Sequence, residues 1–320
     1  MRIDSLYLLK YVGSKARMAG VLSRLIPDHC TIYAELYCGS AAVALNSRNF
    51  KVKILNDYNP HIANFWKVAT DPATSQELLT RLQGTRYSWS DFQAAYGRKE
   101  AHGAKQLDKV QWAIDAFLLN HQSFNATGES WIYRGGTSYE KRLTETTGIP
   151  LVFRRLQEQA FRVHNDNALA VMDKEDLLHN PHAFLFLDPP YLEGLRSDGK
   201  LYQVDMPDSR DHIILLKKIR NARAKIVLSG YWSGRDDGTD LYDYYLLPCG
   251  WHRHLLGEYA KGCEVAEEKS TGAEWCWCNY DLKAEAPGGI AHLKSYCDEE
   301  KSPCLMEWLA LQSSNQTGKV

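Results

Sequence analysis

A carboxylate, two prolines and a tyrosine follow the short apolar run 183–187: Asp188, Pro189, Pro190 and Tyr191. A run of this kind is typical of a strand buried on both faces. The prolines cannot continue a ladder of hydrogen bonds, so the strand must end there. Asp188 and Tyr191 would then lie on a stiff turn at the carboxyl edge of a sheet, where open α/β folds bind their ligands. A proline-stiffened turn without a ligand is the alternative interpretation.

A glycine turn and an acidic residue follow two earlier predicted strands. The first strand, 31–36, leads into Gly39 and Ser40 and then into a helix of small residues. The second strand, which starts at Lys53, ends on Asp57, and Asn59 with Pro60 can start a helix. Nucleoside-binding α/β folds hold ribose hydroxyls with an acidic residue at this place. A helix-capping carboxylate is the alternative, and the glycines do not form the G-x-G-x-x-G pattern of a dinucleotide site.

The N-terminal segment 10–15 is basic and contains a glycine. Ser14 can cap a helix that apolar spacing predicts up to Ile26, before Pro27. A basic turn at a helix start can bind an anion, and an ordinary capped helix is the alternative.

The β-α alternation stops between residues 70 and 160, where short helices are predicted. Residues 81–155 carry eleven Lys or Arg against seven Asp or Glu, whereas residues 232–320 carry eight against fifteen. Ten aromatic residues lie between Tyr87 and Tyr139, and a polar loop at 120–128 interrupts them. Aromatic and basic residues around a polar loop can read or wedge open nucleic acid. A helical subdomain with its own small core is the alternative.

The alternation then resumes with strands expected at 161–167, which ends on polar residues, 183–187, 225–230 and 273–282, and helices at 169–178 and 211–220. The segment 193–208, rich in Gly, Asp and Ser, is a candidate lid. A last helix is expected at 306–311.

Composition indicates an ordinary soluble globular protein, with 44% apolar residues, 24% charged residues and a net charge of −1. No 18-residue apolar span and no signal-peptide pattern are present, so we expect a cytoplasmic protein without membrane contact. The eight cysteines include no C-x2-C pair. Cys276 and Cys278 alternate with tryptophans, which indicates a buried strand rather than a zinc site, and no metal site is predicted.

Together, these segments resemble the Dam-like (D12 class) N6-adenine DNA methyltransferases over residues 8–282. Asp188 to Tyr191 match the catalytic motif of that family. Residues 10–15 are similar to its lysine–aromatic–Gly–Gly–Lys motif, with Ser14 in place of the second glycine. Residues 35–40 are similar to its Glu-Pro-Phe-x-Gly-Gly turn, with Leu36 in place of proline. The segments 56–60, 120–125 and 165–167 match its ribose-binding segment, its Leu-Asn-Arg-x-x-Tyr-Asn-Gly stretch and its Gly-Asp-Phe or Gly-Asp-Tyr position.

The resemblance implies an α/β fold: a mostly parallel, Rossmann-like sheet of the class I S-adenosylmethionine-dependent kind, with one antiparallel strand near its end. It places the catalytic domain at 1–69 and 161–284, an inserted, mostly helical target-recognition subdomain at 70–160, and a C-terminal tail at 285–320. The implied cofactor is S-adenosyl-L-methionine and the implied partner is double-stranded DNA, with a cognate restriction enzyme as a further candidate.

The resemblance also implies roles for individual residues. Asp57 would hold the ribose hydroxyls, Asp166 the adenine amino group of the cofactor, and the backbone of Asn167 the adenine edge. The remaining cofactor contacts are expected from Tyr11, Lys15, Glu35, Tyr37, Gly39 and Ser40. The expected DNA contacts are Lys10, Asn120, Phe124, Asn125 and Arg134.

The catalytic motif suits an amino group as methyl acceptor. Its nitrogen is a poor nucleophile, and hydrogen bonds from both amino hydrogens to the Asp188 carboxylate and the Pro189 carbonyl would turn the lone pair out of the ring plane. Tyr191 offers a face on which a flipped base can stack. Adenine in RNA, the N4 amino group of cytosine in DNA, and an inactive DNA-binding partner of a modification system are the alternatives. Asp in the first position favours adenine over cytosine.

The recognition sequence is not predicted. GATC-reading relatives place an arginine shortly after the loop, whereas acidic or small residues stand there in this chain. Arg134 is the candidate substitute from a different position.

Overall fold

The computed structural model describes residues 6–101, 108–132, 148–192, 206, 208–234, 239–260 and 271–289. Arg134, most of the candidate lid and the expected helix at 306–311 lie outside these residues. The described chain forms two compact units. One holds the described residues of 1–19 and 35–171, and the other holds those of 20–34 and from 172 onward.

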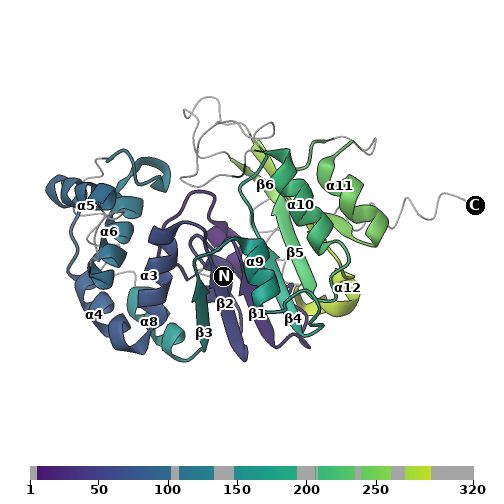
Figure 1. Ribbon diagram of the computed structural model, residues 1–320, viewed down its shortest axis with the longest axis horizontal. Helices are drawn as coiled ribbons and strands as arrows, with labels where there is room; N and C mark the ends of the chain where they lie inside the picture. The colour runs from purple at the N-terminus through teal and green to yellow at the C-terminus, as the bar shows by residue number, and fades with distance from the viewer. Residues whose placement is uncertain are drawn as a thin grey trace, which may run out of the picture. The chain divides into compact units, whose positions relative to one another are not determined.

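Seven strands form one sheet in the order β3-β2-β1-β4-β5-β7-β6 (Figure 1). Strand β2 pairs in parallel with β3, and β4 pairs in parallel with β5, whereas β7 runs antiparallel to both β5 and β6. This confirms the predicted Rossmann-like sheet with one antiparallel strand near its end. The strands are β1 (Ile32–Glu35), β2 (Val52–Asn56), β3 (Phe161–His164), β4 (Ala183–Leu187), β5 (Lys225–Gly230), β6 (His252–Ala260) and β7 (Thr271–Cys278).

Asn or Asp side chains fix the starts of six of the described helices by accepting a backbone N–H from the first turn. These helices are α3 (Pro60–Thr70), α4 (Pro72–Gln83), α6 (Lys109–Gln122), α10 (Ser209–Ile219), α11 (Leu241–Leu246) and α12 (Leu282–Glu285). Other α-helices in the described part of the chain include α1 (Ala19–Leu22), α2 (Ala42–Asn46), α5 (Trp89–Ala101), α8 (Gly148–Gln157) and α9 (Ala168–Lys174). Short 3-10 helices there cover Lys15–Arg17, Phe124–Ala126 and Leu247–Cys249.

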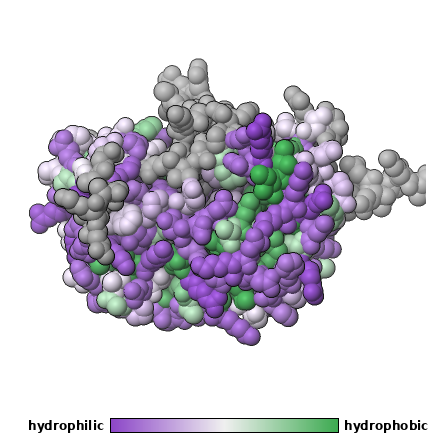
Figure 2. Space-filling view, in the orientation of Figure 1, coloured by the Kyte–Doolittle hydropathy of each residue, from purple (hydrophilic) through white to green (hydrophobic). Residues whose placement is uncertain are grey.

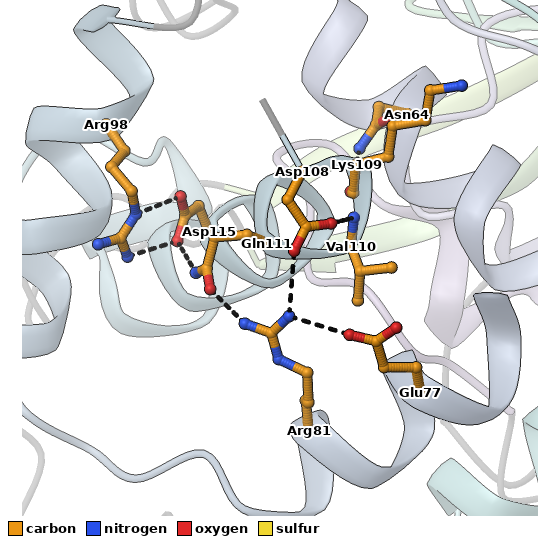
Figure 3. Close-up of polar contacts among 9 residues, drawn as sticks. All are labelled: Asn64, Glu77, Arg81, Arg98, Asp108, Lys109, Val110, Gln111 and Asp115. Carbon is orange, nitrogen blue, oxygen red and sulfur yellow. Dashed lines mark hydrogen bonds and ion pairs between the residues drawn. The ribbon is translucent and has the colours of Figure 1, made fainter. Parts of the chain in front are cut away.

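The described part of the insertion is mostly helical, as predicted. Helix α6 packs against α3, α4 and α5, and α8 packs against α3 and α4 (Figure 1). In Figure 3, polar side chains from α4, α5 and α6 form one network. Arg98 binds both carboxylate oxygens of Asp115 at 2.7 Å, and Gln111 links Asp115 to Arg81. The insertion thus joins β2 and β3 in one compact unit, and its assignment as a separate domain stays a prediction.

The second unit contains β4, the strand that precedes Asp188. All five residues of β4 are buried, which confirms the strand predicted from its apolar run. Strand β7 places Cys276 and Cys278 in the core with no exposed surface, as the Trp-Cys alternation indicates. Tyr280 follows β7, and its hydroxyl donates to the carbonyl of Leu25 at 2.9 Å.

Two predicted elements differ from the structure. A 3-10 helix at Lys15–Arg17 and the single turn of α1 replace the continuous helix expected between Ser14 and Ile26. Strand β6 was not predicted, because its start, His252-Arg253-His254, lacks an apolar alternation.

The face seen in Figure 2 is mainly hydrophilic, with hydrophobic colour in narrow strips. Among the described residues, the largest hydrophobic side chains that remain exposed include Trp89 and Phe124 of the insertion, each at 50%. None of the helices in the described part of the chain combines the length and hydrophobicity needed to cross a bilayer.

Candidate active site

The glycine turn after β1 is held by hydrogen bonds at both of its backbone groups. The N–H of Gly39 donates to Asp57 Oδ2 at 2.8 Å, and its carbonyl accepts Nε1–H of Trp66 at 2.8 Å. Gly39 has a φ of +43°, and a Cβ there would lie 2.6 Å from the ring of Tyr11. The position therefore requires glycine for both conformation and space.

Asp57 connects this turn to the start of α3. Its second oxygen, Oδ1, accepts the N–H of Asn59 at 2.9 Å. Burial raises the pKa of Asp57 from 3.8 to about 6, although the hydrogen bonds from Asn59 and Gly39 act in the opposite direction. Each carboxylate oxygen has two acceptor lone pairs, so these backbone bonds still allow it to accept a hydroxyl hydrogen.

Asn56 brings the two predicted acidic residues to adjacent strand ends. Its amide donates to the carbonyls of Leu36 at 2.9 Å and Asp166 at 3.0 Å, and its oxygen accepts the N–H of Asp166 at 3.1 Å. Asn165 in turn donates to the carbonyl of Asp57 at 2.9 Å. The carboxyl edge of β2 and β3 therefore carries Asp57, which is buried, and Asp166, which is exposed.

Asn167 begins α9. Its N–H donates to Asp166 Oδ1 at 2.7 Å, and its side-chain oxygen accepts the N–H of Leu169 at 2.8 Å. The exposed side chain of Asn167 thus has a capping role in this structure, and its predicted contact with adenine stays a prediction.

The N-terminal motif lies against the glycine turn. The ring of Tyr11 packs on Gly39, and the hydroxyl oxygens of Ser14 and Ser40 are 2.7 Å apart. Lys15 is buried, and its Nζ donates to the carbonyl of Gly13 at 3.2 Å. The structure thus brings together the two motifs that the sequence predicted to share a cofactor.

Glu35 and Lys53 hold the two ends of α2. Glu35 is buried, and its Oε2 accepts the N–H of Ala44 at 2.9 Å. Lys53 Nζ donates to the carbonyls of Ala44 at 2.6 Å and Ser47 at 3.3 Å. Burial, and secondarily the positive charge of Arg155, lowers the pKa of Lys53 to about 7. Contacts of Glu35 and of the half-buried Tyr37 with the cofactor stay predictions.

The predicted catalytic motif, Asp188 to Tyr191, begins directly after β4, in the second unit. Asp188 is half-buried, and its Oδ1 accepts the hydroxyl hydrogen of Ser229 at 2.6 Å. Pro189 is buried and Pro190 half-buried. The structure therefore fixes the position of the carboxylate through β5.

Tyr191 is buried and anchored at its hydroxyl. That hydroxyl donates to Glu274 Oε2 at 2.8 Å, and the ring meets Tyr231 edge-to-face with centroids 4.5 Å apart. Tyr191 is 7% exposed. Its predicted stacking on a base stays a prediction.

The predicted DNA-contacting loop closes on itself at the end of α6. Ser123 and Trp131 form an antiparallel bridge, and the N–H of Phe124 donates to the carbonyl of Ser130 at 2.7 Å. The side chain of Phe124 is half exposed. Asn125 and Ala126 have φ angles of +50° and +59°, a left-handed conformation that is unfavourable for alanine.

Two other residues predicted to contact DNA, Asn120 and Lys10, are less exposed than Phe124. Asn120 is buried in α6, where its amide donates to the carbonyl of Ala116 at 2.8 Å. Lys10 is half-buried, and its N–H lies 3.3 Å from Nε2 of His121. Arg134 lies outside the described residues. The DNA contacts of all five residues stay predictions.

Several residues with structural roles at the site were missed from the sequence: Asn56, Trp66, His121, Ser229 and Glu274. Each acts through a side-chain hydrogen bond to a group distant in sequence, such as the 41 positions between Ser229 and Asp188. Asn56 and Ser229 have a weak signal, because each is a polar residue at or near the end of an apolar strand.

Residues 11–244 match the family described as D12 class N6 adenine-specific DNA methyltransferase. The matched range covers more than half of the 320 residues and includes the glycine turn, both acidic strand ends and the catalytic motif. The chain belongs to this family. The D12-class resemblance predicted from the motifs is thereby confirmed.

The D12-class chain is also similar to individual proteins. It is 22% identical over 271 residues to "Modification methylase LlaI" of Lactococcus lactis subsp. lactis, a match that covers 78% of this chain. The chain spans about two-fifths of the length of that curated relative, 40%. Among solved structures, a precorrin-6y C5,15-methyltransferase from Geobacter metallireducens GS-15 aligns with a TM-score of 0.33 and 12% identity, covering 88% of this chain and 96% of that one. At this score the structural likeness supports no argument.

Proposed function

We propose that this D12-class chain transfers the methyl group of S-adenosylmethionine to the N6 amino group of an adenine in duplex DNA. The observation that carries the proposal is the family match together with the intact Asp-Pro-Pro-Tyr motif, whose carboxylate is held in place at the end of β4. Because DNA is the substrate, we place the reaction in the cytoplasm.

The residues of the first unit fit S-adenosylmethionine by their hydrogen-bonding chemistry. A ribose hydroxyl and an adenine amino group are both donors, and Asp57 and Asp166 supply carboxylate acceptors at adjacent strand ends. Gly39 has no side chain to cover the backbone of the turn. The ring of Tyr11 packs against Gly39, and Ser14 contacts Ser40 of the same turn. When bound, the cofactor supplies an electrophilic methyl group on a sulfonium.

The residues of the second unit act on the target base. Asp188 accepts one N6 hydrogen and the Pro189 carbonyl accepts the other, which directs the nitrogen lone pair out of the ring plane. The Asp188 carboxylate also stabilises the positive charge that develops on nitrogen. Tyr191, held by Glu274, limits the space next to the base. No covalent enzyme intermediate is required.

The insertion is proposed to open the duplex and read its sequence. Phe124 is half exposed on the closed loop after α6, next to the left-handed residues Asn125 and Ala126. An aromatic side chain on a fixed loop can take the place of a base that has left the stack. Moving the base out of the stack costs a few kcal/mol. Lys10 and Arg134 are proposed as phosphate or base contacts.

A restriction enzyme is a further candidate partner. The Lactococcus relative is named as a modification methylase, and the proposal for this chain rests on that name alone. Coexpression with neighbouring nuclease genes would test it: the methyltransferase should protect plasmid DNA, and unchanged cleavage would oppose the pairing.

A methylation assay tests the main proposal. Purified protein is incubated with unmethylated duplex DNA and labelled S-adenosylmethionine, and the DNA is digested to nucleosides. We expect label in N6-methyladenine, its loss in Asp188→Ala, and DNA binding by that variant like the wild type. Label in N4-methylcytosine, preferential methylation of competing RNA, or no label on duplexes of varied sequence would each contradict the proposal.

Cofactor binding can be tested without catalysis. Asp166→Asn replaces a carboxylate acceptor by an amide of the same shape, and we expect S-adenosylmethionine affinity to fall about tenfold by calorimetry. Asp173→Asn, an exposed acidic residue on α9, is the matched control and should bind like the wild type. Equal affinities in the wild type and Asp166→Asn would remove Asp166 from the site.

A further inference from the structure

We propose that Ser229 is a positioning residue for the catalytic carboxylate of Asp188, an inference that rests on the proposed methyltransferase function. Ser229 lies in β5, which pairs in parallel with β4 through Leu187 and Leu228. Its Oγ is 2.6 Å from Asp188 Oδ1 and 3.3 Å from the carbonyl of Leu187. The hydroxyl has a single hydrogen, and the shorter bond to the carboxylate is the stronger one.

Burial explains why this bond determines the direction of Asp188. Ser229 has no exposed surface, so water does not compete for its hydroxyl. Asp188 is half-buried and sits where the strand ladder has ended, so its rotamer is not fixed by strand pairing. The hydrogen bond from Ser229 ties one carboxylate oxygen to β5 and thereby directs the carboxylate as a whole.

The neighbouring strand β7 holds the other end of the motif. Ser229 pairs with Cys276, and Glu274, two residues before it on β7, accepts the hydroxyl hydrogen of Tyr191. Two adjacent strands thus hold the first and last residues of the Asp-Pro-Pro-Tyr turn by side-chain hydrogen bonds. Such an arrangement sets the geometry of the acceptors before DNA binds, so less ordering is needed during the reaction.

Ser229 acts through Asp188 and does not touch the base. A buried hydroxyl contributes to turnover only by directing the carboxylate, so its removal should lower kcat and leave binding unchanged. We expect Ser229→Ala to lower kcat by about tenfold to a hundredfold, with KM for DNA and the S-adenosylmethionine Kd within twofold of the wild type. Ser229→Thr keeps the hydroxyl and should recover part of the loss.

A matched control separates positioning from general stability. Ser23 is also buried and in the same unit, and its hydroxyl donates to the carbonyl of Gly20 at 3.1 Å. Ser23→Ala removes a comparable bond far along the chain from the motif, and kcat should not change. A kcat of Ser229→Ala within twofold of the wild type, or an equal loss in Ser23→Ala, would overturn the proposal.

A double-mutant cycle tests the link without any activity. The Tm is measured for Ser229→Ala, Asp188→Ala and the double variant. If the two side chains act through one bond, the double variant loses less Tm than the sum of the single losses. Additive losses would overturn the proposed link. If the wild type methylates no nucleic acid, the proposed function fails, and the cycle still decides whether Ser229 holds Asp188.

Discussion

The hydroxyl oxygens of Ser14 and Ser40 lie 2.7 Å apart, and each serine stands where the D12-class motifs have glycine. Ser14 belongs to the N-terminal motif, and Ser40 to the glycine turn. Two departures from the family pattern therefore contact each other. In this chain a direct hydrogen bond joins the N-terminal motif to the glycine turn, and glycines at these two positions would leave the segments unlinked by side chains.

This pair predicts a coupling between Ser14 and Ser40. Alanine at either position removes the bond, so the second substitution should cost less than the first. We expect a coupling free energy of about 0.5–1.5 kcal/mol in urea unfolding of Ser14→Ala, Ser40→Ala and the double variant. The exposed hydroxyl pair Ser88 and Ser90, 2.8 Å apart, is the control. Water can replace that bond, so its coupling should be near zero; equal couplings for the two pairs would contradict the prediction.

Ala126→Gly should stabilise the protein. Ala126 has a φ of +59°, and the left-handed region costs a residue with a Cβ about 1–2 kcal/mol. Glycine removes that cost but adds about 0.5–1 kcal/mol of unfolded-state entropy, so a net gain of roughly 0.5 kcal/mol follows. Ala94→Gly, at an exposed position in α5, should instead lose about 1 kcal/mol. Destabilisation by both substitutions would oppose the argument.

Removing Arg98 should destabilise the insertion. Asp115 is 1% exposed, and in the network of Figure 3 Arg98 supplies its two charged hydrogen bonds. Breaking a fully buried pair costs about 3–5 kcal/mol, but Arg98 is 39% exposed and Gln111 still donates, so Arg98→Met should cost about 2 kcal/mol in denaturant unfolding. The pair Lys218–Asp173 is the control because its carboxylate is 70% exposed, and Lys218→Met should cost under about 1 kcal/mol. Equal losses would count against a special role of the Arg98–Asp115 pair.

His121 predicts a loss of stability in mild acid. Its Nε2 is 2.9 Å from the carbonyl of Leu8, and burial, followed by the charge of Lys10, lowers its pKa to about 3. Below pH 6.5 the unfolded chain binds a proton that the folded chain does not, so the free energy of unfolding falls as pH drops towards 3. Relative to its value at pH 7, wild type should lose about 2 kcal/mol more than His121→Gln at pH 5.

Asp57 changes stability in the opposite direction. Its pKa is raised from 3.8 to about 6, so its contribution is present below pH 3.8 and is lost as pH rises through 6. The comparison of wild type with His121→Gln cancels this effect, because both contain Asp57. Parallel pH curves for wild type and His121→Gln would contradict the prediction.

The strands that end at candidate site residues could be predicted from the sequence, because residues next to those ends stop a strand or start a helix. Proline after Asp188, glycine after β1 and the Asn59-Pro60 cap each stop a strand or start a helix by their own conformational limits. The Asn59-Pro60 cap located Asp57 at the carboxyl edge, and the polar end of the strand predicted at 161–167 located Asp166. Strand β6 was missed because its polar start resembles a loop, and it forms through pairing with β7.

The residues that hold the site together could not be predicted in the same way. The roles of Trp66 and Ser229 depend on the backbone or side chain that the fold brings opposite them. Hydrophobic periodicity predicts that Trp66 is buried, but not that its Nε1 donates to Gly39. Such partners are distant in sequence, so a single sequence carries little information about them.

Strands β2 and β3 are paired although β2 ends at Asn56 and β3 begins at Phe161. The entropic cost of closing a loop rises only with the logarithm of its length, about 0.6 kcal/mol for each doubling. The pairing of these strands is therefore almost insensitive to how many residues connect them. We expect the connecting helices to diverge in length and sequence among relatives while Asn56, Asp57 and Asp166 keep their places. The insertion can then change in evolution without rebuilding the pairing of β2 with β3.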